Sequence, residues 1–151
     1  MYGMSFGTPI GIITIQYDDE YLLRLLFGRQ GPSDFCDNEI CRETMKQIHE
    51  YFSGRRRHFD IKYRLEGSPL AVNVWRAVAG IPFGQTRTYS EIAAAAHNEK
   101  AVRAAASCVG KNPLPVIIPC HRVIRKSGDT GNYSGGAAAK RFLLELEGNK
   151  F

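Results

Sequence analysis

Every second position in residues 11–17, "GIITIQY", carries a large apolar side chain from Ile13 onward, and this spacing is typical of a β-strand. Three acidic residues, 18–20, follow as a turn. Residues 21–27, "YLLRLLF", can then return as an antiparallel strand. The pattern predicts a small antiparallel sheet near the start of the chain.

Apolar residues at helical spacing predict the next element. They recur at steps of four, three and four, which gives one stripe of an amphipathic helix: Cys41, Met45, Ile48 and Phe52. Gly54 ends this helix. The first part of the chain therefore combines a sheet with a single helix.

The composition changes near Gly67. Ser68 can cap a helix, and Pro69 suits its first position because no backbone N–H is needed there. This helix would run through Trp75 to Gly80. We expect an α+β protein with two domains, residues 1–64 with the sheet and its helix, and residues 65–151 that are mostly helical.

Two short helices follow in "TYSEIAAAAHNEKAVRAAASCVG". Thr88 and Glu91 have the spacing of a capping box, so the first helix would run from residue 89 to about 96 and the second over about 99–109. A tight turn joins them, and Asn98 could cap the second helix while Gly110 closes it. The pattern fits a helix-turn-helix and an ordinary helical hairpin equally well.

The second of these helices presents small residues with a single long cation, Arg103. A helix that reads bases in the major groove normally offers several long polar side chains. This low profile suits a sugar-phosphate surface or a narrow groove better than sequence reading. The last helix is expected over residues 137–147, with an apolar stripe of Ala139, Phe142, Leu143 and Leu146 and with Glu147 at its edge.

Composition and charge narrow the class of protein. The chain has 151 residues, is 44% apolar and 23% charged, and is therefore globular. It has no apolar run near the ~20 residues needed to span a bilayer and no secretory pattern at its start, so we expect a cytoplasmic protein. The net charge of +5 is compatible with a polyanionic partner such as nucleic acid.

The four cysteines lack the spacing of a zinc finger or a CxxC motif. Cys36 and Cys41 could pair, although we favour structural thiols for both and for Cys108. Cys120 differs, because "IIPCHRVI" places a thiol beside His121 in an otherwise apolar segment. A thiolate paired with a base is a strong nucleophile. In extended chain the two side chains would point apart, so the pairing requires a bend or a bridging water, and a structural role stays open.

Five motifs in order, "TYSEIA", "VRAAA", "KNPLPVIIP", "IPCHRV" and "GNYSGG", resemble the O6-alkylguanine-DNA alkyltransferases, DNA-repair methyltransferases that act once. The resemblance is dense from about Trp75 to Gly148, and the N-terminal half is similar only in layout. It implies a ribonuclease-H-like N-terminal domain and a winged-helix-like C-terminal domain. It also implies direct repair of double-stranded DNA with the helix-turn-helix in the minor groove. We expect a monomer that uses no cofactor and no membrane.

The resemblance assigns the chemistry to a few residues. Cys120 matches the alkyl acceptor, His121 the base that acts on the thiol through a water, and Glu147 the carboxylate that orients this histidine. Asn112 matches the amide that pins the bend before the cysteine. Tyr89 matches the tyrosine that crowds the 3′ phosphate and hydrogen-bonds the flipped base.

The resemblance also assigns the DNA contacts. Arg103 matches the arginine that enters the duplex in place of the flipped base, and Ala104 and Arg122 are expected at the DNA. The pocket for the base would be lined by Tyr133, Ser134, Val123 and Asn132.

Some members of this family hold a structural zinc with Cys and His in the N-terminal part. The spacing of Cys36, Cys41, His49 and His58 does not match that site, so we predict no metal. Alkyltransferase-like proteins carry another residue in place of the cysteine, and Cys120 argues against that subclass. Three alternatives are a cysteine hydrolase, a DNA-binding regulator and a damage-recognition module without transfer.

Overall fold

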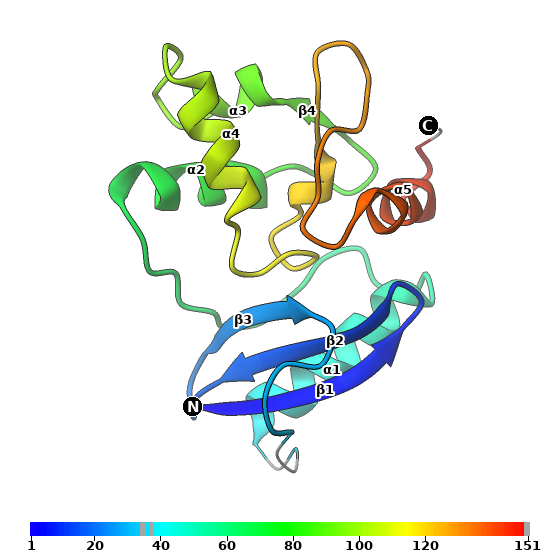
Figure 1. The fold of residues 1–151 in the computed structure, drawn as a ribbon. Helices are drawn as coiled ribbons and strands as arrows, with labels where there is room; N and C mark the ends of the chain where they lie inside the picture. Colours follow the sequence, from blue (N-terminus) through cyan, green and yellow to red (C-terminus); the bar gives the residue numbers. More distant parts are fainter. Residues whose placement is uncertain (34–35, 37, 150–151) are drawn as a thin grey trace. The chain divides into compact units, whose positions relative to one another are not determined.

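The computed structural model describes residues 1–33, 36 and 38–149. The chain divides into two compact units, Met1–Leu65 and Glu66–Phe151 (Figure 1). The combination of an antiparallel sheet with helices confirms the predicted α+β class. None of the described helices has both the length and the apolar character needed to cross a membrane.

The first unit is built on a three-stranded antiparallel sheet. Its strands are β1 (Tyr2–Thr8), β2 (Gly11–Tyr17) and β3 (Leu22–Phe27), in the order β1-β2-β3. The last two were predicted, and β1 was not. The signal for β1 is present, since its alternate residues, Tyr2, Met4 and Phe6, are large and apolar between smaller neighbours.

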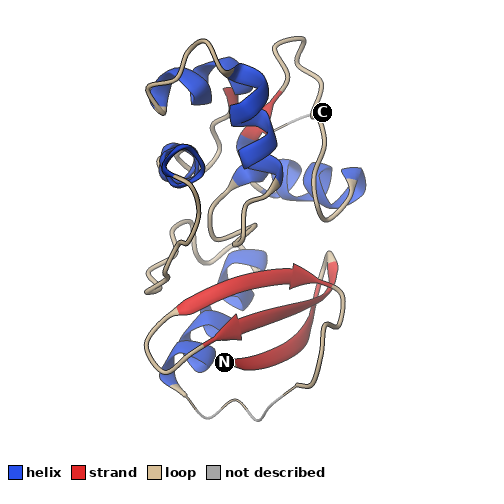
Figure 2. Ribbon diagram, turned by 60° about the vertical axis from the view of Figure 1, so that its left-hand side comes forward, coloured by secondary structure: helices blue, strands red, loops and turns tan. Residues whose placement is uncertain are grey.

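Helix α1 (Glu39–Phe52) packs on this sheet (Figure 2). Its buried face is Cys41, Thr44, Gln47, Ile48 and Tyr51. The predicted stripe was right at Cys41 and Ile48, but Met45 and Phe52 are only half-buried. The helix is rotated slightly from the predicted stripe, because the large ring of Tyr51 and the amide of Gln47 are buried instead.

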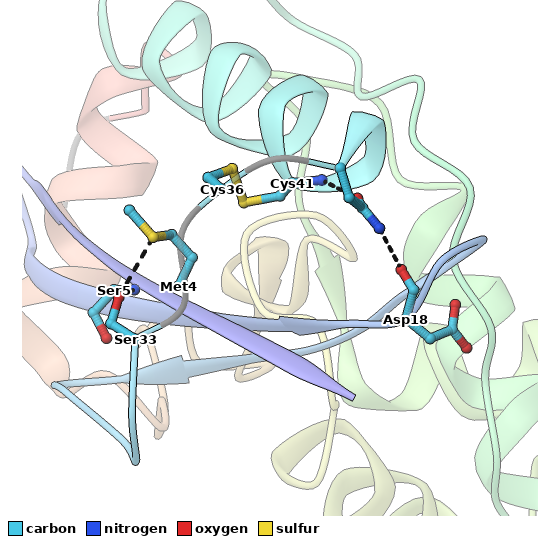
Figure 3. Close-up of a disulfide and its surroundings, with 7 residues drawn as sticks. Met4, Ser5, Asp18, Ser33, Cys36 and Cys41 are labelled. Atoms are coloured by element: carbon cyan, nitrogen blue, oxygen red, sulfur yellow. Dashed lines mark hydrogen bonds between the residues drawn. A yellow bond between two sulfur atoms is a disulfide. The ribbon is translucent and has the colours of Figure 1, made fainter.

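Asn38 fixes the start of α1 and links it to the sheet. Its side-chain oxygen accepts a hydrogen bond from the backbone N–H of Cys41 (3.0 Å), and its amide donates to the carbonyl of Asp18 (2.9 Å). Cys41 is joined to Cys36 by a disulfide, with a Cα–Cα distance of 5.7 Å (Figure 3). Our preference for free thiols at these two positions was therefore wrong. The cap places Cys41 in the first helical turn, within reach of the segment that precedes the helix.

The second unit is mostly helical and carries a two-stranded parallel ribbon. Its elements in order are α2 (Pro69–Ala79), β4 (Arg87–Thr88), α3 (Tyr89–Ala95), α4 (Val102–Gly110), the 3-10 turn η1 (Cys120–Arg122), β5 (Val123–Ile124) and α5 (Ala137–Leu146). Helices α2, α3 and α4 pack together, and α5 packs against η1. Strand β4 pairs with β5, which places the start of α3 next to the chain that leaves η1.

The two short helices joined by a turn are present as predicted. The capping box is complete, because Thr88 Oγ1 accepts from the N–H of Glu91 and Glu91 Oε1 accepts from the N–H of Thr88. Helix α4 begins three residues later than expected, because the side chain of Asn98 does not cap it. Gly110 is the last helical residue and does not adopt the left-handed conformation that we expected of it.

Helix α5 buries Ala139 and Leu143 as predicted, but the rest of its buried face differs from the predicted stripe. Phe142 is 39% exposed, whereas Lys140, Leu143 and Leu144 are fully buried. Glu147 follows as the cap of the helix and is also buried. The buried face therefore includes a cation and a carboxylate, which a stripe drawn from apolar residues alone misses.

Candidate active site

The segment that leads to Cys120 is a tight bend held by Asn112. The side-chain oxygen of Asn112 accepts from the backbone N–H of Leu114 (2.9 Å), and its amide donates to the carbonyl of Ile118 (2.7 Å). Between these contacts Val116 is buried at φ +75°. This left-handed conformation costs a β-branched residue about 1–3 kcal/mol. The bend is thus held in a strained shape just before the cysteine.

Cys120 is the first residue of η1 and is 5% exposed. The turn of η1 supplies the change of direction that the pairing of Cys120 with His121 requires. Burial raises the pKa of the Cys120 thiol to about 11, while a hydrogen bond with Asn112 and the positive charge of Lys140 oppose the rise. The sulfur is therefore held as a thiol that has to lose its proton as it reacts.

A buried carboxylate, Glu147, contacts the two residues that follow Cys120. Glu147 Oε2 lies 2.7 Å from Nε2 of His121. Arg122 donates from Nε to Oε1 (2.7 Å) and from Nη2 to Oε2 (2.9 Å), and from Nη1 to the carbonyl of Ile81 (2.6 Å). Two parallel bonds from a guanidinium give geometric specificity as well as strength. Glu147 is therefore fixed in place by Arg122 while it holds the imidazole.

These contacts determine which nitrogen of His121 carries the proton. Arg122 keeps Glu147 an acceptor, so Nε2 of His121 donates to it and Nδ1 bears the lone pair. Nδ1 has no hydrogen-bond partner among the described residues. Burial lowers the pKa of His121 despite the opposing effect of Glu147, and the charges of Arg122 and Lys140 add to the lowering. A neutral imidazole with an available lone pair is the state that a general base needs.

The low pKa of His121 predicts that acid destabilises this unit. The unfolded chain protonates its histidines near about pH 6.5, whereas the folded chain resists protonation of His121 until a lower pH. Below about pH 6.5 the unfolded state therefore binds more protons, so the stability contributed by the neutral histidine is present above this pH and is lost below it. We expect the free energy of unfolding to fall by up to ~1.4 kcal/mol per pH unit. Denaturant titrations followed by the fluorescence of Trp75, the single tryptophan, measure this slope.

The control for this pH dependence is a second histidine. His121→Gln should flatten the slope below about pH 6.5, because it removes the titrating group. His58→Gln removes an exposed histidine but keeps His121, so it should retain the fall in stability that His121 causes. A slope that persists in His121→Gln would contradict the assignment.

The second unit has a cavity of about 660 Å³ with Cys120 in its wall. Its lining includes six of the predicted site residues: Tyr89, Arg103, Cys120, Asn132, Tyr133 and Ser134. Small residues of α4, among them Ala106 and Gly110, form another part of the wall. The volume lies in the range of small-molecule sites, so the cavity has room for a purine base.

Tyr89, which lines the cavity, packs closely against Gly131. Gly131 has φ +77°, and a Cβ at that position would lie 3.0 Å from the hydroxyl oxygen of Tyr89. Glycine at 131 therefore provides both the left-handed backbone and the space for the tyrosine ring. Burial, together with the charge of Cys120, raises the pKa of Tyr89, so its hydroxyl keeps its proton and can donate a hydrogen bond.

The other predicted site residues lie outside the described lining of the cavity. His121 is buried within η1 and Glu147 at the end of α5, Val123 is fully buried in β5, and Ala104 is exposed on α4. Arg122, which we expected at the DNA, is buried, and its three guanidinium nitrogens donate within the protein. The tight turn of η1 directs this side chain toward Glu147, so we reassign Arg122 from DNA contact to holding the carboxylate.

Two charged residues at the site were not singled out from the sequence. Arg125 lines the cavity beside Cys120, and nothing in its local pattern distinguishes it from other surface cations. Lys140 is fully buried and acts electrostatically on Cys120. A signal for Lys140 exists, since it precedes Leu143 and Leu144 by three and four positions and so lies on the buried face of the helix. Among the described residues, no three His, Cys, Asp or Glu side chains gather as a metal-binding group.

Comparison with known proteins shows which family this chain resembles. Residues 1–65 match the family described as 6-O-methylguanine DNA methyltransferase, ribonuclease-like domain, and residues 69–149 match its DNA binding domain. A methylated-DNA–protein-cysteine methyltransferase of Methanosarcina acetivorans is 40% identical over 99% of both chains. One from Mycobacterium bovis is 43% identical over 95% of this chain and 90% of its own.

A solved structure gives the same result. The crystal structure of Mycobacterium tuberculosis OGT in complex with DNA superposes with a TM-score of 0.89 at 35% identity, covering 97% of this chain and 92% of that one. These matches confirm the predicted α+β fold, the enzyme class and direct-reversal DNA repair as the function. The chain therefore belongs to the 6-O-methylguanine DNA methyltransferase family, as its motifs implied.

Proposed function

We propose that this chain takes the alkyl group from an O6-alkylguanine in duplex DNA and keeps it on Cys120. The observation that carries the proposal is the position of Cys120 in the wall of a cavity that also includes Tyr89 and Arg103. His121 follows Cys120 in η1, and its Nε2 lies 2.7 Å from Oε2 of Glu147. We assign the roles of nucleophile, base and orienting carboxylate to Cys120, His121 and Glu147, in analogy to a hydrolase triad.

The transfer is a displacement at the alkyl carbon. The thiol of Cys120 gives its proton to Nδ1 of His121 through a water, and the sulfur forms a bond to the alkyl carbon. The carbon–oxygen bond to guanine breaks, and its electron pair stays with the guanine. The proton leaves the sulfur only at the moment of transfer, because the pKa of about 11 keeps the resting Cys120 as a thiol.

Tyr89 assists the departure of guanine. Its raised pKa keeps the phenol protonated, so the hydroxyl can donate a hydrogen bond to the charge that develops on the purine. The loop of residues 131–136 places Tyr133 and Ser134 in the same cavity wall, where they would contact the base. These contacts favour a flipped guanine over water in the cavity.

Helix α4 supplies the DNA contact in this proposal. Arg103 and Ala104 are exposed on it, and Arg103 also lines the cavity. A helix with so low a profile fits a minor groove, and Arg103 would fill the gap that the flipped base leaves. Flipping costs a few kcal/mol, and less for a base whose pairing is already damaged. The relative of known structure was crystallised with DNA, which supports this arrangement.

The product is a thioether, which offers no carbonyl for water to attack. We therefore expect one transfer per molecule. The test is to incubate the protein with an excess of duplex DNA that carries O6-methylguanine and to follow the methyl group by intact mass and peptide mapping. The expected result is one added methyl group, on the peptide that contains Cys120.

Two controls accompany this experiment. Cys108 is the other free cysteine among the described residues and should stay unmodified. An undamaged duplex should give no mass change. Repeated turnover beyond one equivalent, or a methyl group on any other residue, would contradict the proposal.

A further inference from the structure

Lys140 is a fully buried lysine to which the transfer chemistry above gives no role. Its ammonium donates to two backbone carbonyls, that of Val123 at 2.6 Å and that of Asn132 at 3.2 Å. Val123 follows η1 directly, and Asn132 belongs to the loop that lines the cavity. One cation therefore joins the chain that leaves the nucleophile to the loop that lines the same cavity.

Burying the charged ammonium of a lysine at this position costs free energy. Lysine is almost never fully buried unless it is paired, and the two carbonyls that accept from Lys140 are neutral. Burial lowers the pKa of Lys140 to about 8, and the charge of Arg125 adds to this, while Cys120 and Asp129 oppose it. An apolar side chain would fill the same stripe of α5 beside Leu143 at lower cost. The site thus keeps a cation that packing alone does not require.

The position of this cation matters for the sulfur. The positive charge of Lys140 favours the thiolate of Cys120, against the burial that raises the pKa of that thiol to about 11. The same charge disfavours protonation of His121. Both effects help the displacement. The sulfur loses its proton more readily, and the imidazole of His121 is neutral and can accept that proton.

We propose that Lys140 is a positioning residue of the transfer site, which fastens the loop of residues 131–134 to the start of β5 and stabilises the negative charge that develops on Cys120. The part that concerns the reaction rests on the proposed function. The part that concerns the loop and the sulfur is a property of the protein without DNA.

Two neutral variants separate these parts. Lys140→Met removes both the charge and the donor, and Lys140→Gln removes the charge but keeps a donor. Arg141→Met is the matched control, since it removes an exposed cation from the next position of the same helix. The readouts are the rate at which iodoacetamide modifies Cys120 as a function of pH, resolved by peptide, and amide hydrogen exchange in residues 131–134.

We expect both neutral variants to raise the apparent pKa of the Cys120 thiol by about one unit, which slows its modification near neutral pH about tenfold. Methyl transfer should slow by a similar factor. Exchange in residues 131–134 should be fastest in Lys140→Met, and Arg141→Met should match the wild type throughout. If Lys140→Met does not fold, Lys140→Gln still tests the effect on the sulfur.

An unchanged thiol pKa in the neutral variants would overturn the proposal. Its failure is distinguishable from failure of the proposed function, because iodoacetamide needs no DNA. A wild-type protein that transfers no methyl group would refute the function, and the thiol pKa would still decide the role of Lys140.

Discussion

Cys120→Ala is expected to abolish methyl transfer completely while duplex DNA is still bound. Alanine offers no nucleophile, and no other described free cysteine lies in the cavity wall. The substitution removes one buried atom and should cost about 1 kcal/mol of stability, so the fold and the exposed residues of α4 persist. Transfer is measured as methyl bound to protein, and binding by a gel shift with the same methylated duplex.

The matched control is Cys108→Ala, which removes the half-buried free cysteine of α4. It should transfer one methyl group at the wild-type rate. A methylated product from Cys120→Ala would mean that another residue accepts the group. Loss of DNA binding in Cys120→Ala together with loss of transfer would mean that the cysteine supports the structure, which was the alternative that the sequence left open.

Much of the fold could be predicted from local patterns. The alternation in β2, the cap at Ser68 and the capping box at Thr88 each encode their element within a few residues, and each element is present in the structure. Strand β1 carries the same alternation but was overlooked. The disulfide at Cys41 depends on how the chain turns before α1, and spacing alone does not decide it.

The identities of the site residues could be predicted from the sequence, but the contacts that these residues make could be predicted less well. The motifs of the family identified Cys120, His121 and Glu147, and the structure places the latter two 2.7 Å apart. Arg122 was assigned to DNA because an arginine beside a DNA-repair nucleophile suggests phosphate. Its burial follows from the three-dimensional position of Glu147, which lies 25 residues away in sequence.

The buried face of α5 shows most clearly where reading from apolar residues fails. Lys140, Leu143 and Glu147 follow one another at steps of three and four and are all buried. The predicted stripe included the exposed Phe142, placed Glu147 only at its edge and omitted Lys140. In this helix the two polar positions on the inward face are those that serve the site, since Glu147 holds His121 and Lys140 acts on Cys120.

Glu147→Gln is expected to slow methyl transfer by about 10²–10⁴-fold. The shape of the side chain is kept, but the amide brings a donor into a place where Arg122 and His121 both donate. If the amide oxygen keeps Arg122, its NH₂ faces Nε2 of His121, which then becomes the acceptor and moves its proton to Nδ1. The nitrogen that should receive the proton of the thiol is thereby occupied. The buried guanidinium also loses its counter-ion, which should lower the free energy of unfolding by about 3 kcal/mol.

Two further variants separate the effect of the His121 tautomer on the transfer rate from the effect of lost stability. Glu145→Gln, an exposed change on the same helix, should alter neither rate nor stability. Arg122→Met should also be destabilising, but it leaves Glu147 as an unshared acceptor for His121, which raises the pKa of the histidine. Its transfer rate should therefore fall near neutral pH and recover as the pH rises, whereas the rate of Glu147→Gln should stay low throughout. Equal recovery in both variants would contradict the claim that Glu147 fixes the proton of His121 on Nε2.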